Sequence, residues 1–88
     1  MITREQFFKA MSDELDYAYK KHGKALWGRH EFSSILREEV DEAWDDVKAD
    51  APTEQLLAEV VQIAAMCLRY AETGDRTRGE HPPITPRG

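Results

Sequence analysis

Apolar residues recur at helical spacing in the first part of the chain. They fall on one face of a helix at 3.6 residues per turn: Phe7, Phe8, Met11, Leu15, Ala18 and Tyr19. Thr3 and Gln6 precede this stripe at the spacing of a capping box, in which each side chain satisfies a backbone donor of the first turn. Gly23 accepts a positive φ without strain and is therefore a favourable helix end. We predict a helix that begins after Thr3 and runs to about His22.

Two further helices follow from the same pattern. The second apolar stripe predicts a helix from His30 to Ala49 with Trp44 in the core, and it consists of Ile35, Leu36, Val40, Ala43, Trp44 and Val47. The segment 50–52, Asp-Ala-Pro, interrupts the helical pattern. Thr53 is a favourable N-cap residue for a third helix, which runs to about Thr73 and ends before Gly74.

The third helix is apolar on nearly all sides. Between Leu56 and Leu68 only Glu59 and Gln62 are polar, and Cys67 is expected to pack in the buried stripe. A helix of this kind is normally enclosed on several sides, yet a chain of 88 residues buries only about 60% of its surface. The fold class we predict is therefore all-α, a three-helix chain that forms a helical bundle completed by dimerisation. The alternative is a well-covered helix in a monomeric bundle.

Composition divides the chain and restricts its partners. Residues 1–73 form the predicted helical domain, and residues 74–88 hold three prolines and three glycines, which predicts a flexible, basic, Pro-rich tail. No apolar run approaches the roughly 20 residues of a membrane span. The first residues lack a basic region followed by an apolar run, so we do not expect a secretory signal there. One cysteine suits a reducing cytoplasm. A net charge of −5 argues against a nucleic-acid partner.

Acidic residues concentrate in the second helix. Glu39 and Glu42 are three apart and lie on one helix face, as do Glu59 and Gln62 on the third helix. If the two helices pack antiparallel, these pairs converge beside the core. Two carboxylates about 6 Å apart repel by roughly 3 kcal/mol at an effective dielectric near 20. A hard divalent cation, Mg²⁺ or Mn²⁺, would neutralise them; the alternative interpretation is a solvated acidic surface.

The same residues resemble a known motif. Glu38-Glu39-Val-Asp-Glu42, a 16-residue gap and Glu59-Val-Val-Gln62 are similar to the EExxE…ExxD pattern of the MazG-like all-α nucleoside triphosphate pyrophosphohydrolases. The resemblance implies four-helix cores completed by dimerisation, and hydrolysis of a nucleoside or deoxynucleoside triphosphate to monophosphate and pyrophosphate. It also implies metal ligation by Glu39, Glu42 and Glu59, with Glu38 as a catalytic acid that holds metal or activates water.

One position departs from the family pattern. Gln62 stands where the family has Asp, so the fourth metal position offers an amide oxygen without charge. Two alternatives to an active hydrolase therefore stay open. One is a catalytically impaired protein that binds nucleotide, and the other is a helical oligomerisation or interaction module without enzyme activity. The oligomer is expected to be a dimer or a tetramer of this chain.

The loop between the first two helices holds the candidate substrate-binding residues. Trp27 offers an aromatic face to a base, and Lys24 and Arg29 offer cations to phosphates, with Lys20 and Lys21 nearby. The alternative is a tryptophan that closes the end of the bundle among ordinary surface charges.

Overall fold

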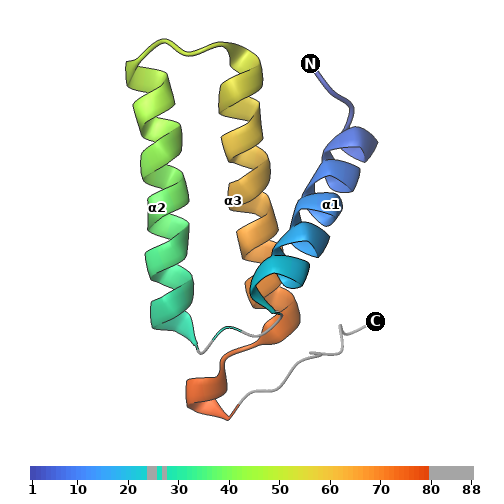
Figure 1. Ribbon diagram of the computed structural model, residues 1–88, viewed down its shortest axis with the longest axis vertical. Coiled ribbons are helices and arrows are strands. Elements are labelled where there is room, and N and C mark those ends of the chain that lie inside the picture. The colour runs from blue at the N-terminus through green and yellow to red at the C-terminus, as the bar shows by residue number, and fades with distance from the viewer. Residues whose placement is uncertain (24–25, 27, 80–88) are drawn as a thin grey trace.

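Three α-helices and a short 3₁₀ helix make up the computed structural model, which describes residues 1–23, 26 and 28–79 (Figure 1). The elements in chain order are α1 (Arg4–His22), α2 (Arg29–Lys48), α3 (Thr53–Thr73) and η1 (Arg76–Arg78). No strand occurs in these described residues. The predicted all-α class and the three helices are therefore confirmed.

The ends of α1 are fixed as the sequence predicts. The backbone N–H of Gln6 donates to Thr3 Oγ1 over 3.1 Å, and the backbone N–H of Thr3 donates to Gln6 Oε1 over 2.8 Å. This reciprocal pair is the capping box. At the other end Gly23 has φ 78°, and its N–H donates to the carbonyl of Tyr19. A glycine reaches this φ without a steric penalty, so α1 ends there.

The turn between α2 and α3 differs from the prediction in one residue. Asp50 adopts φ 53°, a left-handed conformation that Asp tolerates better than most residues. The N-cap of α3 is Pro52, and no side chain caps the helix. Thr53 was expected at that position but is already helical, because the carbonyl of Pro52 accepts the N–H groups of Gln55 and Leu56.

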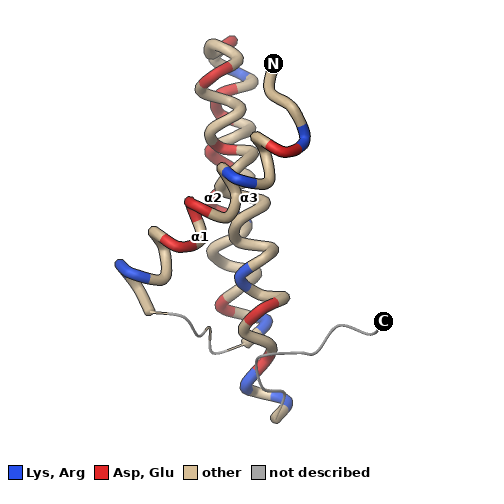
Figure 2. The backbone as a smooth tube through the Cα atoms, turned by 90° about the vertical axis from the view of Figure 1, so that its right-hand side faces the viewer, with Lys and Arg blue, Asp and Glu red and all other residues tan. Residues whose placement is uncertain are grey.

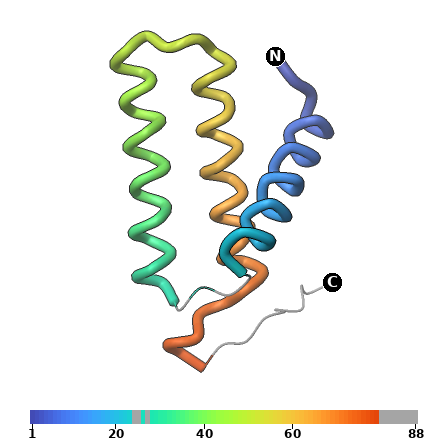
Figure 3. Tube along the Cα trace, in the orientation of Figure 1, coloured from blue at the N-terminus to red at the C-terminus, as the bar shows by residue number. Residues whose placement is uncertain are grey.

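Helices α2 and α3 form an antiparallel pair, and α1 crosses this pair at an angle (Figures 2 and 3). The C-terminal half of α1 approaches α3, whereas its N-terminal end diverges from it (Figure 1). The core of the described residues is small, with four buried apolar side chains: Leu15, Leu26, Ala65 and Met66. No residue of α2 is buried. Within the described part of the chain, no helix is both long and apolar enough for a membrane span.

Two residues that were predicted to be buried are exposed. Trp44 is 56% exposed, and Cys67 lies at the surface. The residues of α2 and α3 that approach α1 lie on one shoulder of each helix, whereas Trp44 and Cys67 lie on the other shoulder. None of the described residues covers that second side of the helix pair, so Trp44 and Cys67 are exposed to water.

Residues 74–79 depart from the expected flexible tail. They turn back against the start of α2, where Asp75 is fully buried and Arg29 Nε donates to Asp75 Oδ2 over 2.7 Å. Thr77 donates to Asp75 Oδ1 through its backbone N–H and its hydroxyl. A Cβ at Gly28 would lie 2.6 Å from Asp75 Oδ1, so only glycine fits there. The remainder of the predicted tail, 80–88, lies outside the described residues.

Candidate metal centre and adjoining pocket

Three carboxylates meet between α2 and α3. Glu39 and Glu42 come from one face of α2 and Glu59 from the facing side of α3, and one oxygen from each lies within 4.8 Å of the others. Because the helices are antiparallel, residues near the middle of α2 face residues in the first half of α3. The expected convergence of these three acids is therefore confirmed.

Two carboxylate oxygens of this cluster are buried without a hydrogen-bond donor among the described residues. Glu39 Oε2 and Glu59 Oε2 are shielded from water, and neither has a hydrogen-bond partner among the described residues. Burial raises the pKa of Glu39, and the charges of Glu42 and Glu59 raise it further. Burial likewise raises the pKa of Glu59, together with the charge of Glu42 and a hydrogen bond with it. A shielded carboxylate oxygen without a donor is costly unless a proton or a cation occupies it.

Three other acids of α2 differ in their relation to this cluster. Asp46 lies one turn beyond Glu42, is half-buried, and its charge helps to raise the pKa of Glu59. Its Oδ1 accepts a hydrogen bond from Gln55 Nε2 over 2.7 Å, while its Oδ2 has no partner among the described residues. Asp45 instead pairs with Lys48 at the surface over 3.3 Å. Glu38, the predicted catalytic acid, is exposed and not among the three converging carboxylates.

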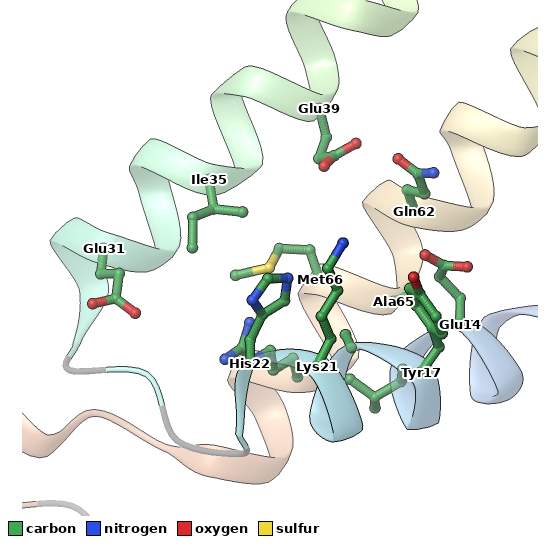
Figure 4. A pocket seen from close by; sticks show the side chains of 13 residues that line it. Glu14, Tyr17, Lys21, His22, Glu31, Ile35, Glu39, Gln62, Ala65 and Met66 are labelled. Atoms are coloured by element: carbon green, nitrogen blue, oxygen red, sulfur yellow. The ribbon is translucent and has the colours of Figure 1, made fainter.

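A pocket of about 700 Å³ adjoins the cluster. It lies between all three helices, and Glu39 and Gln62 mark the end nearest the carboxylates (Figure 4). Met66, Ile35 and Leu15 give it an apolar wall. Gln62 therefore belongs to the pocket lining and stands beside Glu39, where its amide can serve either a cation or a ligand in the pocket.

The rest of the pocket lining is charged, and α1 supplies much of it. Glu14 is half-buried there, and its negative charge helps to raise the pKa of Glu39. Lys21, His22 and Arg69 contribute positive or titratable groups to the same lining. Glu14 was not among the predicted site residues, because it lies far from the acidic motif along the chain. The signal available was its spacing three residues before Tyr17, on the face of α1 that turns toward α3.

The predicted substrate-binding residues are placed as follows. Arg29 is at the start of α2, paired with Asp75 and outside the pocket lining. Trp27 and Lys24 lie outside the described residues. Of the described basic residues that were expected near the loop, Lys21 lines the pocket, whereas Lys20, the preceding residue of α1, does not; both side chains are exposed.

The donor set of the cluster fits a hard divalent cation. All three ligand atoms are carboxylate oxygens, and no His or Cys contributes to the group. Oxygen ligands suit Mg²⁺ and Mn²⁺, whereas Zn²⁺ sites in proteins use nitrogen and sulfur ligands more often. Mg²⁺ also retains several waters, so three protein ligands suffice. No family model, curated protein or solved structure matches the chain.

Proposed function

We propose that this protein is a metal-dependent hydrolase that converts nucleoside or deoxynucleoside triphosphates to monophosphate and pyrophosphate. The observation that carries the proposal is the set of three converging carboxylates, two of them with shielded oxygens that have no donor. The adjoining pocket of about 700 Å³ is within the usual range of small-molecule sites. The resemblance of residues 38–62 to the MazG-like motif agrees with both features.

In this proposal the acidic residues have separate roles in the reaction. Glu39, Glu42 and Glu59 hold Mg²⁺ or Mn²⁺ through their carboxylate oxygens, and Glu38 has the catalytic role that the resemblance implies. The bound cation supplies neutralisation of phosphate charge and lowers the pKa of coordinated water. Glu39 belongs to the carboxylate cluster and also lines the pocket. It therefore connects the metal site with the space where the nucleotide binds.

Hydrolysis of a panel of triphosphates tests this proposal. Purified protein is incubated with ribo- and deoxynucleoside triphosphates in Mg²⁺ or Mn²⁺, and monophosphate and pyrophosphate are measured. Glu39→Gln replaces one charged metal ligand with a neutral side chain of the same size, and it is expected to lower the hydrolysis rate at least 100-fold. Asp41→Asn is the matched control, because Asp41 is exposed on the opposite side of α2. Equal rates with and without metal would contradict the proposal.

A protein that binds nucleotide without turnover is the second candidate, and Gln62 favours it. Its amide beside Glu39 gives the pocket end of the cluster one charge fewer than the family pattern has. Gln62→Asp restores that charge and is expected to tighten Mg²⁺ binding about tenfold. If the wild type binds triphosphate without product and Gln62→Asp hydrolyses it, the second candidate is correct. If Gln62→Asp changes neither Mg²⁺ binding nor hydrolysis of the triphosphate, Gln62 does not explain the absence of turnover.

We propose further that the active form is a homo-oligomer, at least a dimer. Val40, Trp44 and Val47 form an exposed apolar row on α2, and Val60 is exposed on the same side of α3. Together with the lack of any buried residue in α2, this row favours a second copy as its cover, which would complete a four-helix core.

Molecular mass in solution tests the oligomer. Trp44→Glu is expected to convert it to a monomer, since a charge on the covered face would be desolvated on association, and Tyr17→Glu is an exposed aromatic control on another helix. A wild-type oligomer that is indifferent to both metal and nucleotide would instead support an interaction module without enzyme activity.

A further inference from the structure

The pocket contains a cation that the metal site does not use. Lys21 lies in the last turn of α1 and lines the pocket together with Glu39 and Gln62. Figure 4 shows its amine at the end of an extended side chain that points toward the space between those two residues. The carboxylate cluster and Lys21 therefore approach one cavity from different helices.

The amine of Lys21 is held by an aromatic ring and not by a carboxylate. Lys21 Nζ lies 5.8 Å from the centroid of the Tyr17 ring, within the range of a cation–π contact. Among residues 1–23, 26 and 28–79, no acidic group forms an ion pair with it. A ring face positions an ammonium group without occupying its three N–H donors. These donors are therefore available to a ligand in the pocket.

The other basic residues of the lining are less suited to bind an anion. Arg69 is 7% exposed, and its Nη2 donates to the carbonyl of Gly23 over 3.2 Å, which ties α3 to the end of α1. Among the basic residues of the described lining, Lys21 is thus the one whose amine points into the cavity between Glu39 and Gln62.

Charge balance indicates what Lys21 contacts. Three carboxylates around one divalent cation retain a net negative charge, and Gln62 adds no charge of either sign. A triphosphate is a polyanion, so a cluster of this kind attracts it only weakly unless another cation offsets the charge of the phosphates that the metal does not contact. A lysine that projects toward the metal site supplies that charge as a point cation.

We infer that Lys21 binds the phosphate chain of the substrate, so that the triphosphate bridges from the Glu39–Glu42–Glu59 metal site to the Lys21 amine. This inference rests on the proposed function for the chemistry at the metal site. It adds a residue from α1 to a site otherwise built from α2 and α3. It also assigns α1 a role in substrate binding in addition to its packing against α3.

The test compares Lys21→Met with Lys20→Met, which removes the same charge from a neighbouring exposed position outside the pocket. Inorganic tripolyphosphate in excess Mg²⁺ is the calorimetric probe, because it carries the phosphate chain without base or sugar. Lys21→Met is expected to weaken its binding roughly tenfold. Lys20→Met is expected to change the affinity for tripolyphosphate less than twofold. Lys21→Arg is expected to retain most of that affinity. Hydrolysis of a nucleoside triphosphate by the same variants is expected to show a raised KM for Lys21→Met.

The outcomes separate this inference from the proposed function. If the wild type binds tripolyphosphate through Lys21 but hydrolyses no triphosphate, the inference stands and the hydrolase proposal fails. If the wild type hydrolyses triphosphates and the two methionine variants behave alike, the hydrolase proposal stands and Lys21 has no part in it. Should Lys21→Met tighten Mg²⁺ binding and leave tripolyphosphate unaffected, Lys21 is only a counter-charge to the cluster, and the inference is overturned. Absence of any tripolyphosphate binding by the wild type also overturns it.

Discussion

The α2–α3 pair holds buried carboxylate oxygens at two places, and their surroundings are opposite. Asp75, which packs against the start of α2, accepts hydrogen bonds from Arg29 and from the backbone and hydroxyl of Thr77. Those donors hold its pKa well below the ordinary range, with Thr77 the largest contributor. Glu39 and Glu59, in the middle of the pair, have oxygens without donors and raised pKa values.

This difference separates a structural carboxylate from a candidate functional one. Every donor around Asp75 comes from the chain itself, so the group is complete without a ligand and stabilises the fold. In the Glu39–Glu42–Glu59 cluster, by contrast, Glu39 Oε2 and Glu59 Oε2 have no donor among the described residues and the acids repel one another, so the ionised form is unfavourable until a cation binds. Three variants test this difference between the two sites. For each variant, the unfolding temperature (Tm) is compared with that of the wild type at the same protein concentration.

Asp75→Asn is expected to have the largest effect, a decrease in Tm of roughly 5–10 °C at pH 7, because the charge-assisted hydrogen bond that Arg29 donates to the buried Asp75 carboxylate is lost. The pKa of Asp75 is lowered by folding, so its stabilisation is present above its ordinary pKa and is lost as pH falls through the folded value. The variant and the wild type should therefore converge in strong acid. An unchanged Tm at pH 7 would show that the ion pair of Arg29 and Asp75 contributes nothing to the stability of the fold.

Glu59→Gln is expected to act in the opposite direction, with a metal-free Tm about 3 °C higher at pH 7. The pKa of Glu59 is raised by folding, so its favourable, protonated contribution is complete below the unfolded pKa and is lost as pH rises through the folded value. The gain should disappear as pH falls below the ordinary glutamate pKa of 4.5, because Glu59 is then protonated in both the folded and the unfolded protein. A decrease in Tm at pH 7 would mean that the Glu59 carboxylate already has a partner.

Tyr70→Phe is expected to have the smallest effect, about 1 °C or less. The Tyr70 hydroxyl lies 3.4 Å from Asp75 Oδ2, a long contact beside the shorter ones from Arg29 and Thr77. The ring itself packs on Phe32 with centroids 4.4 Å apart, and phenylalanine keeps this contact. A loss as large as that of Asp75→Asn would show that the hydroxyl is essential to the buried group.

Local signals in the sequence predicted the helices and the acidic cluster. The capping box at Thr3 and the glycine at position 23 depend on residues within one turn, and both are confirmed. The convergence of Glu39, Glu42 and Glu59 needed only their spacing and an antiparallel pair of helices. Periodicity and turn chemistry determine such features, so they can be read from a single chain.

Features that depend on where helices cross could not be read in this way. Trp44 lies on an apolar stripe, but α1 packs on the other shoulder of the helix pair, and Trp44 stays exposed. Asp75 follows a glycine in a segment rich in polar residues, and its burial depends on Arg29, which lies 46 residues earlier. Glu14 and Lys21 reach the pocket only because the second half of α1 crosses α3. Periodicity does not specify crossing positions.

Calorimetric titration of Mg²⁺, and separately Mn²⁺, into metal-free protein at pH 7 tests whether Glu39, Glu42 and Glu59 bind a divalent cation, with Glu59→Gln and Asp75→Asn titrated in parallel. We expect saturable binding to the wild type and to folded Asp75→Asn, and binding at least tenfold weaker to Glu59→Gln. Equal binding by the wild type and Glu59→Gln, or no binding by the wild type, would show that the three carboxylates are an ordinary acidic surface and not a metal centre.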